Sequence, residues 1–297
     1  MQTPRAARPK LRRGRQGEPD IDDLTQLLDM PAAQPRARGS VALSVRTDGA
    51  VTRLRDLRQA GSLKVMFPRS APETKQAVIV NTAGGVTGGD RFTLNATVEQ
   101  DARLVLTTQA AERAYRAQPG APGWIRNRLS VAGGGALDWL PQETILFEGS
   151  NLERDTRIDL DADARLLFVE PLIFGRRAMG ETLTDLRFRD RVDIHRDGVP
   201  LFLDAAGFDG DAEAHLDRPH IAGGARAIAL IVVVAPEAET HLAPLRAMLP
   251  ATAGASLIGP DLLVARILAP DGFALRAALM PILRRLSGAP LPRPWMI

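Results

Sequence analysis

Apolar and polar residues alternate along much of the chain, and turn residues interrupt the alternation at intervals of about 30 residues. Four segments share this layout of alternating stretch, short turn and second alternating stretch. They are residues 91–109, 128–140, 157–169 and 191–203. Alternation is typical of a strand with one buried face, and two such strands around a turn predict an antiparallel hairpin. The segments therefore predict a succession of stacked hairpins.

Helical spacing of apolar residues appears only late in the chain. Residues 238–248 carry an apolar stripe that stops before Pro250. Residues 272–290 predict a second helix, bent or broken near Pro281 and ended by Gly288. The predicted fold class is mainly β: an irregular, solenoid-like stack of antiparallel hairpins with two helices in the C-terminal region.

Charge is distributed unevenly along the chain. The formal net charge is +3, but residues 1–18 carry six basic side chains against Glu18 alone, which leaves −2 for the rest. Together with the interrupted helical pattern at 19–30, this predicts a disordered basic tail over residues 1–38 that holds at most one short helix. Residues 39–297 are predicted to form a single β-rich domain.

Composition excludes several kinds of chemistry. The chain has no cysteine, so disulfides, thiolate zinc sites and cysteine nucleophiles are ruled out. Its four histidines do not form the i, i+4 pair of a helical zinc site. No apolar run approaches the roughly 20 residues that span a bilayer, so no membrane association is expected and a cytoplasmic location fits.

A glycine-rich loop, NTAGGVTGGDRF at residues 81–92, raises the question of a phosphate site. A nucleotide-binding P-loop places Lys and Ser or Thr after its last glycine, whereas Asp90 follows Gly89 here. The dinucleotide and nucleophile-elbow motifs are also absent. The loop is therefore predicted to be a tight turn, with at least one glycine at positive φ or in a contact too close for a Cβ.

Several stretches together resemble the UreD (also called UreH) family of urease accessory proteins, in the family's order. They are NTAGGVTGGDRF (81–92), TTQAAERAYR (107–116), LDWLPQETILFEGS (137–150), GRRAMGE (175–181) and LPRPW (291–295). The resemblance covers residues from about 40 to 297 and leaves the basic tail outside.

The resemblance implies a non-enzymatic protein with a β-helix-like stack of strands and two helices. Such a protein is expected to dock the helical accessory protein UreF and the GTPase UreG onto apo-urease, and to help deliver nickel to the urease active site. Nickel is then cargo in transit, and no cofactor is expected to stay bound. The helix at 272–286 and the LPRPW end are predicted to contribute to the surface for the helical partner.

Carboxylates within apolar strands are the candidate groups for a nickel path. Asp90, Glu143, Glu170 and Glu181 are favoured because each lies in or beside a family-like segment among residues that look buried. A buried carboxylate is costly unless it is paired, hydrogen-bonded or bound to a cation. Ion pairs with the many arginines are the competing explanation. Glu112 is a weaker candidate, since Arg113 lies beside it.

Two other functions remain open from the residues alone. One is a carboxylate-based hydrolase on a β-helix-like scaffold, which requires two acids roughly 5–10 Å apart in an open groove lined by aromatic residues. An aromatic content of 4% argues against it. The other is nucleic-acid binding through the N-terminal arginines, although the resemblance leads us to expect no nucleic acid among the partners.

Overall fold

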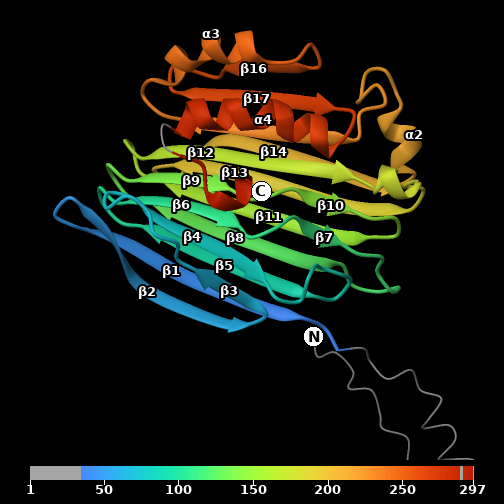
Figure 1. The fold of residues 1–297 in the computed structure, drawn as a ribbon, viewed down its shortest axis with the longest axis horizontal. Coiled ribbons are helices and arrows are strands. Elements are labelled where there is room, and N and C mark those ends of the chain that lie inside the picture. Colours follow the sequence, from blue (N-terminus) through green and yellow to red (C-terminus); the bar gives the residue numbers. More distant parts are fainter. Residues whose placement is uncertain (1–34, 288–289, 297) are drawn as a thin grey trace, which may run out of the picture. The chain divides into compact units, whose positions relative to one another are not determined.

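A computed structural model describes residues 35–287 and 290–296, of which residues 37 onward belong to one compact unit. Most of the predicted basic tail thus lies outside the described residues. Strands stack from β1 upward to the region of β16 (Figure 1). A seven-stranded sheet contains, in spatial order, β14 (Val199–Gly210), β13 (Leu186–Arg196), β11 (Asn151–Leu160), β8 (Gly123–Val131), β5 (Arg91–Val98), β1 (Arg38–Asp48) and β2 (Val51–Gly61).

A ten-stranded sheet packs against the first. Its main path is β16 (Ala253–Leu257), β17 (Leu262–Ala269), β15 (Ala227–Val234), β12 (Arg165–Phe174), β9 (Ala136–Leu140), β6 (Arg103–Thr108), β4 (Lys75–Asn81) and β3 (Leu63–Met66). Two short strands lie off this path: β10 (Thr144–Leu146) pairs with β12, and β7 (Glu112–Ala114) pairs with β10. The mainly β, β-helix-like stack predicted from the sequence is confirmed.

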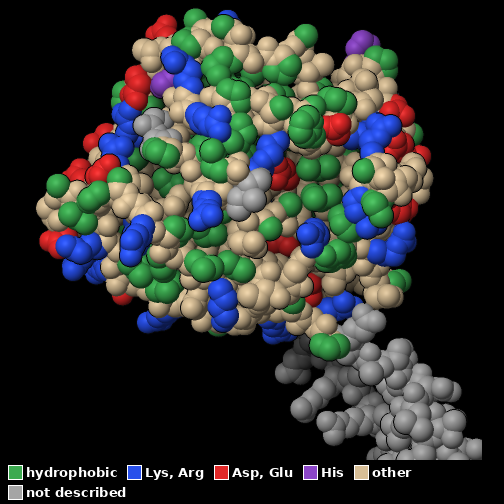
Figure 2. Space-filling model, viewed as in Figure 1, with side chains coloured by type: hydrophobic (Ala, Val, Ile, Leu, Met, Phe, Trp, Pro, Cys, Tyr) green, Lys and Arg blue, Asp and Glu red, His purple; other side chains and the backbone are tan. Residues whose placement is uncertain are grey.

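Helices add a third layer outside the ten-stranded sheet. The longer ones are α3 (Ala238–Met248) and α4 (Gly272–Ser287), which contact β12, β15, β16 and β17. Apolar residues form one cluster between the sheets and a second between the ten-stranded sheet and these helices. On the face that carries α4, Lys and Arg side chains are spread singly over the surface (Figure 2).

Strand pairing differs from the predicted hairpins in three of the four segments. The arms of 91–109 lie in different sheets, β5 in one and β6 in the other, and the same holds for β8–β9 and β11–β12. Each arm pairs in parallel with the equivalent arm of the next segment. Only 191–203 forms the expected antiparallel hairpin, β13–β14. An arch between two sheets and a hairpin within one sheet produce the same alternation, since both bury one face of each strand.

The turns of the arches continue the hydrogen-bond ladder of the sheets. Backbone N–H groups of Ala132 and Asp161 donate to the carbonyls of Val98 and Val131, one coil away, at 2.9 Å. On the other side of the turn, the N–H of Ala136 donates to Ala102 at 2.9 Å. Stacked turns therefore satisfy backbone groups that a hairpin turn would leave to solvent or side chains.

The helices depart from expectation in two details. The second predicted helix is neither broken nor ended at Pro281: α4 runs through this residue to Ser287, and Gly288 lies outside the described residues. Tolerance of a proline inside a helix requires stabilising contacts elsewhere, and Leu279, Ile282 and Leu283 of α4 are buried. A further short helix, α2 (Ala212–Leu216), was not predicted.

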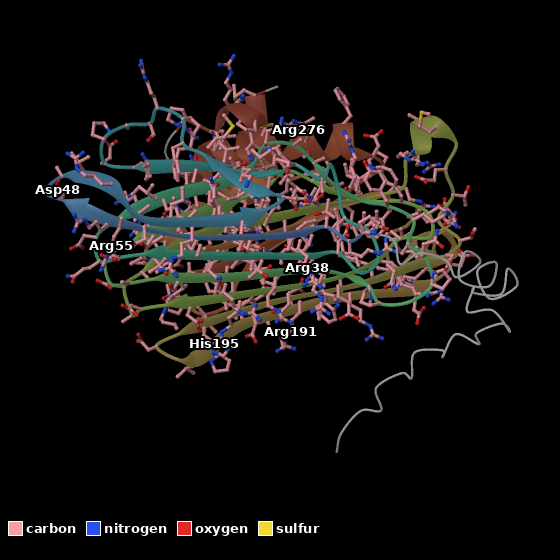
Figure 3. The ribbon with its side chains drawn as sticks, turned by 90° about the horizontal axis from the view of Figure 1, so that it is seen from below. Arg38, Asp48, Arg55, Arg191, His195 and Arg276 are labelled. Atoms are coloured by element: carbon pink, nitrogen blue, oxygen red, sulfur yellow. The ribbon has the colours of Figure 1, made fainter. Side chains whose placement is uncertain are left out.

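The C-terminal segment packs into the protein instead of forming an exposed apolar end. Trp295, in the 3-10 turn η2 (Arg293–Met296), is 1% exposed, and its indole N–H donates to the Leu140 carbonyl at 2.9 Å. Arg276 of α4, labelled in Figure 3, donates to the Trp295 carbonyl at 2.8 Å. Its guanidinium lies 5.0 Å from the centroid of the Trp295 ring. Because α4 and β9 bury the Trp295 ring, this side chain is not part of an exposed surface, and the contribution of the LPRPW end to partner binding stays a prediction.

The glycine loop is the tight turn that the sequence predicts. Gly84 has a φ of +77°, and Gly89 one of +85°. Gly85 has an ordinary φ, but a Cβ there would lie 2.6 Å from the Arg113 carbonyl oxygen and 2.3 Å from the ring of Tyr115. The loop is held by its neighbours, since the N–H of Val86 donates to the same Arg113 carbonyl at 2.8 Å.

Substituting Gly85 with alanine should destabilise the fold by about 1–3 kcal/mol, because the added Cβ overlaps backbone as well as a side chain. Gly207→Ala on β14 is the matched control, since nothing lies within 4 Å of its Cβ position. Chemical denaturation of both variants provides the measurement. Equal stability of the two variants would contradict this account of the loop.

Replacing Trp295 with alanine should lower the unfolding free energy by about 3–5 kcal/mol, because a cavity forms and the Leu140 carbonyl keeps only the Thr107 hydroxyl as a side-chain donor. Met296→Ala provides the control, since that neighbouring side chain is 57% exposed. Urea denaturation measures both effects. A Trp295→Ala variant as stable as Met296→Ala would show that the C-terminal turn contributes nothing to the core.

Candidate functional site

An arginine lies buried between the two sheets. Arg154 of β11 donates through Nε and Nη2 to the two oxygens of Asp190 on β13, at 2.9 and 2.6 Å. Its Nη2 is also 3.1 Å from Oε2 of Glu170, which comes from β12 of the opposite sheet. Nη1 donates to the hydroxyl of Thr144 at 3.0 Å. One guanidinium on β11 therefore contacts β10, β12 and β13, and so links four strands and both sheets.

The charges of this cluster are set by burial and by one another. Burial raises the pKa of Glu170 well above its ordinary value, although Arg154 opposes the shift. Burial also favours the neutral form of Asp190, but its bidentate contact with Arg154 outweighs this and lowers its pKa. For Arg154, burial disfavours the charge, while Asp190 and Glu170 more than compensate and raise its pKa. Arg154 and Asp190 thus favour each other's charged forms, whereas burial favours the neutral form of Glu170.

A small cavity with a largely apolar lining and a few polar and charged groups, here called the chamber, adjoins this cluster. About 80 Å³ of it is open to the centre of a water molecule, which is room for a few waters. Its lining combines apolar residues with oxygen-bearing side chains from both sheets. The polar members are Thr93, Thr108, Glu112, Asn127, Gln142, Thr144, Arg154 and Glu170.

Two further cavities adjoin the chamber through shared lining residues. The first, here called the mouth, lies beside the glycine loop, measures about 290 Å³ and shares Thr108 and Glu112 with the chamber. The second, here called the groove, measures about 560 Å³ and lies against α4. The groove shares Gln109 with the mouth and Gln142 with the chamber. The three cavities thus adjoin one another in a series from the glycine loop, through the interior, to α4.

Three carboxylates mark this series. Glu170 lines the chamber, and Glu112 lines both the chamber and the mouth. Burial raises the pKa of Glu112, while hydrogen bonds from Asn81 oppose the shift. Glu143 lines the groove and forms an ion pair with Arg276 at 3.1 Å. Two of the four predicted residues and the weaker candidate therefore face the adjoining cavities.

The other two predicted residues hold loops together. The Asp90 carboxylate accepts the N–H of Ala37 at 2.7 Å and that of Thr87 at 2.9 Å. Glu181 accepts three hydrogen bonds from Arg176, and these, with burial opposing, lower its pKa. Among the described residues, no three His, Asp or Glu side chains gather closely enough to hold a metal ion.

Sequence reasoning missed Arg154 and Asp190, although their positions carried a signal. Arg154 lies an even number of positions from the buried Leu152 and Ile158, so it shares their face of β11. Asp190 likewise shares the face of the buried Phe188 on β13. Alternation therefore places both charges inward. A buried arginine requires carboxylate partners, so this pattern predicts an internal ion pair.

A further carboxylate with a perturbed pKa lies on the outer side of the ten-stranded sheet. Asp138 of β9 sits in register between Val105 and Leu167. Burial raises its pKa to about 7, although Arg103 opposes the shift. This group lies outside the three cavities, so its effect is expected on stability.

The fold and the chamber define the class of protein: a solenoid-like β scaffold with a cavity between its two sheets, lined by apolar and a few charged side chains, and with a helical layer on one sheet. None of the described helices is both long and apolar enough to cross a membrane. Residues 37–296 match the family model described as UreD urease accessory protein.

Curated relatives agree with this match over nearly their whole length. The chain is 54% identical to the urease accessory protein UreD of Ruegeria pomeroyi over 255 residues, which cover 86% of this chain and 99% of that protein. It is 48% identical to the UreD of Roseobacter denitrificans over 267 residues, or 90% and 97% of the two chains. The chain belongs to the UreD family, and this membership supports a role in urease maturation.

Asp138 should make the protein less stable as the pH rises from about 4 to about 7. Over that range the folded protein holds a proton that the unfolded chain, with an ordinary Asp pKa near 3.9, has released. The free energy of unfolding of Asp138→Asn should therefore increase, relative to that of wild type, by on the order of 1–4 kcal/mol between pH 4 and pH 8. Denaturation curves at several pH values measure this difference.

Asp209→Asn, at an exposed position of β14, serves as the control and should change stability equally at both ends of the pH range. If the stability difference between Asp138→Asn and wild type also does not change with pH, the buried carboxyl of Asp138 does not cause the loss of wild-type stability at higher pH.

Proposed function

We propose that this protein is a cytoplasmic, non-catalytic scaffold for urease maturation, which docks UreF and UreG onto apo-urease and passes nickel through its interior. The observation that carries the nickel step is the series of adjoining cavities formed by the mouth, the chamber and the groove. The family match supports the wider role in maturation.

The donors along the series suit passage better than storage. Glu112, Glu170 and Glu143 are spread over successive cavities, so an ion meets carboxylates one after another. Hydroxyl and amide oxygens of Thr108, Thr144 and Gln142 supplement them in the chamber. Oxygen ligands hold divalent nickel less tightly than imidazole or thiolate ligands, so the ion is released more readily.

Arg154 limits the attraction of the chamber for a cation. Its positive charge lies 3.1 Å from Glu170 and neutralises part of the field that a free carboxylate would present. Burial raises the pKa of Glu170, so an entering cation competes with a proton for this carboxyl. Both effects reduce the residence time of an ion in the chamber.

The chamber does not favour the hydrolase alternative. Its 80 Å³ is well below the roughly 300–1,000 Å³ of ordinary ligand pockets. Glu170 and Asp190 both contact Arg154 and lie between the sheets, not along an open groove. The nucleic-acid alternative concerned residues 1–18, which lie outside the described part of the chain.

Glu112→Gln and Glu170→Gln should each reduce the nickel delivered per urease active site by several-fold, because they remove charge while keeping nearly the same shape. Partner binding should stay intact. The measurement is the nickel content of urease matured by each variant in a purified mixture, at matched amounts of complex. Matched controls are Asp90→Asn and Glu181→Gln, which remove carboxylates outside the series.

Equal nickel loading by all four variants would refute passage through the interior. Equal losses in the controls would show instead that any carboxylate change disturbs the scaffold. Binding of wild-type protein to neither UreF nor apo-urease would refute the scaffold function itself.

A further inference from the structure

The outer face of the seven-stranded sheet carries a row of aligned side chains. Strand register places Arg38, Arg91, Trp124, Glu153 and Arg189 side by side across β1, β5, β8, β11 and β13. Adjacent strands are about 4.8 Å apart, so the row extends over roughly 19 Å. The helices α3 and α4 pack on the other sheet and leave this face without a helical cover from either of them.

Four arginines of this face, here called the arginine patch, lack ion pairs. They are Arg38, Arg91, Arg126 and Arg189, all exposed, and none forms an ion pair with any described residue. Arg126 lies two positions along β8 from Trp124, with its guanidinium 5.9 Å from the indole centroid. An exposed, flat group of arginines around a tryptophan has the composition of a protein interface.

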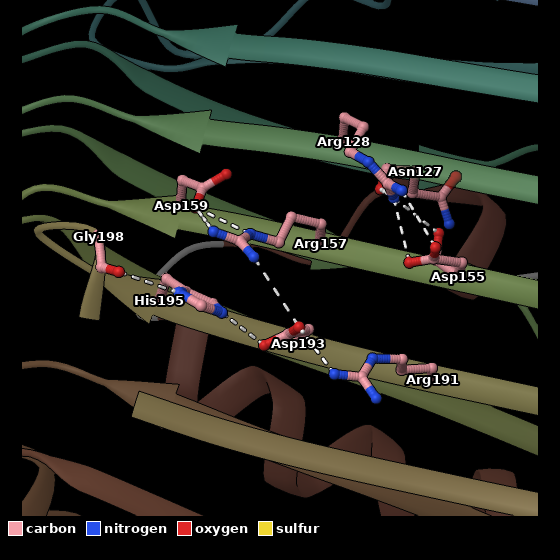
Figure 4. A network of polar contacts seen from close by, with 9 residues as sticks. All are labelled: Asn127, Arg128, Asp155, Arg157, Asp159, Arg191, Asp193, His195 and Gly198. Atoms are coloured by element: carbon pink, nitrogen blue, oxygen red, sulfur yellow. Dashed lines mark hydrogen bonds and ion pairs between the residues drawn. The ribbon is translucent and has the colours of Figure 1, made fainter. Parts of the chain in front are cut away.

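Neighbouring arginines on the same sheet face form ion pairs, unlike the arginines of the patch. Arg128 pairs with Asp155 at 3.0 Å, and Arg191 contacts Asp193 at 3.1 Å. The same Asp193 lies 2.7 Å from Nε2 of His195 (Figure 4). The described residues thus provide ion-pair partners for one end of the sheet face, whereas no carboxylate among them lies within ion-pair distance of the four patch arginines.

Repulsion within the arginine patch lowers the stability of the isolated protein. Arg38 and Arg91 are direct neighbours on parallel strands, and like charges in such positions destabilise a sheet. No described carboxylate lies within ion-pair distance to offset the repulsion. An external acidic surface would remove this cost by placing carboxylates over the guanidinium groups.

We propose that the arginine patch is a docking surface for a folded protein that presents carboxylates on a flat face. This inference rests on the proposed scaffold function and names the surface and the partner chemistry that it uses. Glu153 lies within the row and Asp155 beside it, so negative charges interrupt the arginines. A uniformly negative phosphate backbone would meet repulsion there, whereas a protein surface can match both signs.

The test measures binding of the full chain to two probes separately, apo-urease and UreF, at low ionic strength and at about 0.15 M salt. The patch variant is Arg91→Gln with Arg126→Gln and Arg189→Gln. The control variant, Arg69→Gln with Arg177→Gln and Arg218→Gln, removes three exposed arginines that also lack ion pairs but lie in loops elsewhere.

The patch variant should bind one of the two probes about 10- to 100-fold more weakly and with less dependence on salt, while the control binds like wild type. Thermal stability should stay unchanged or rise, because Arg91→Gln relieves the repulsion with Arg38. This combination separates a docking role from a structural one.

Wild-type affinity of the patch variant for both probes would overturn the inference while leaving the scaffold function standing. Failure of wild type to bind either probe would instead refute the scaffold function, and the inference with it. Patch-dependent binding of a duplex DNA or RNA probe, or patch-dependent self-association, would assign the surface to another occupant and overturn the inference as well.

Discussion

Burial of the Arg154 guanidinium is the constraint around which the middle of the structure is arranged. An arginine does not lose its charge under ordinary conditions, so its burial requires carboxylates close by. Asp190 on the neighbouring strand and Glu170 on the opposite sheet meet this requirement. The polar groups around them, such as Thr144, keep water-sized space open in a core that would otherwise close with apolar side chains.

The same cluster relates stability to the proposed function. Removing one partner of a buried ion pair typically costs about 3–5 kcal/mol, which argues that the fold depends on it. Under the proposed function, Glu170 of this cluster would also meet a nickel ion in the chamber. The protein therefore combines a solid apolar core along most of its strands with one polar region in the middle.

The two outer faces of the stack serve different purposes. The ten-stranded sheet is covered by α3, α4 and the buried Trp295, and this covering completes a second apolar cluster. The seven-stranded sheet presents charged side chains, among them the unpaired arginines around Trp124. A scaffold that assembles several proteins benefits from such asymmetry, because one face stabilises the fold and the other remains open for contact.

The sequence by itself determined the strands, the main turns, the two longer helices and the special role of the glycine loop, because each depends on local spacing and backbone freedom. Family membership was also evident from short sequence stretches that follow the family's order along the chain, such as those that contain Asp90 and Glu143. Tertiary structure alone decided whether alternating strands form hairpins or arches, since both bury one face. It also decided that Glu170 lines a cavity while Glu181 fixes a loop, and that Trp295 is buried. These outcomes depend on partners far away in the chain, which periodicity does not identify.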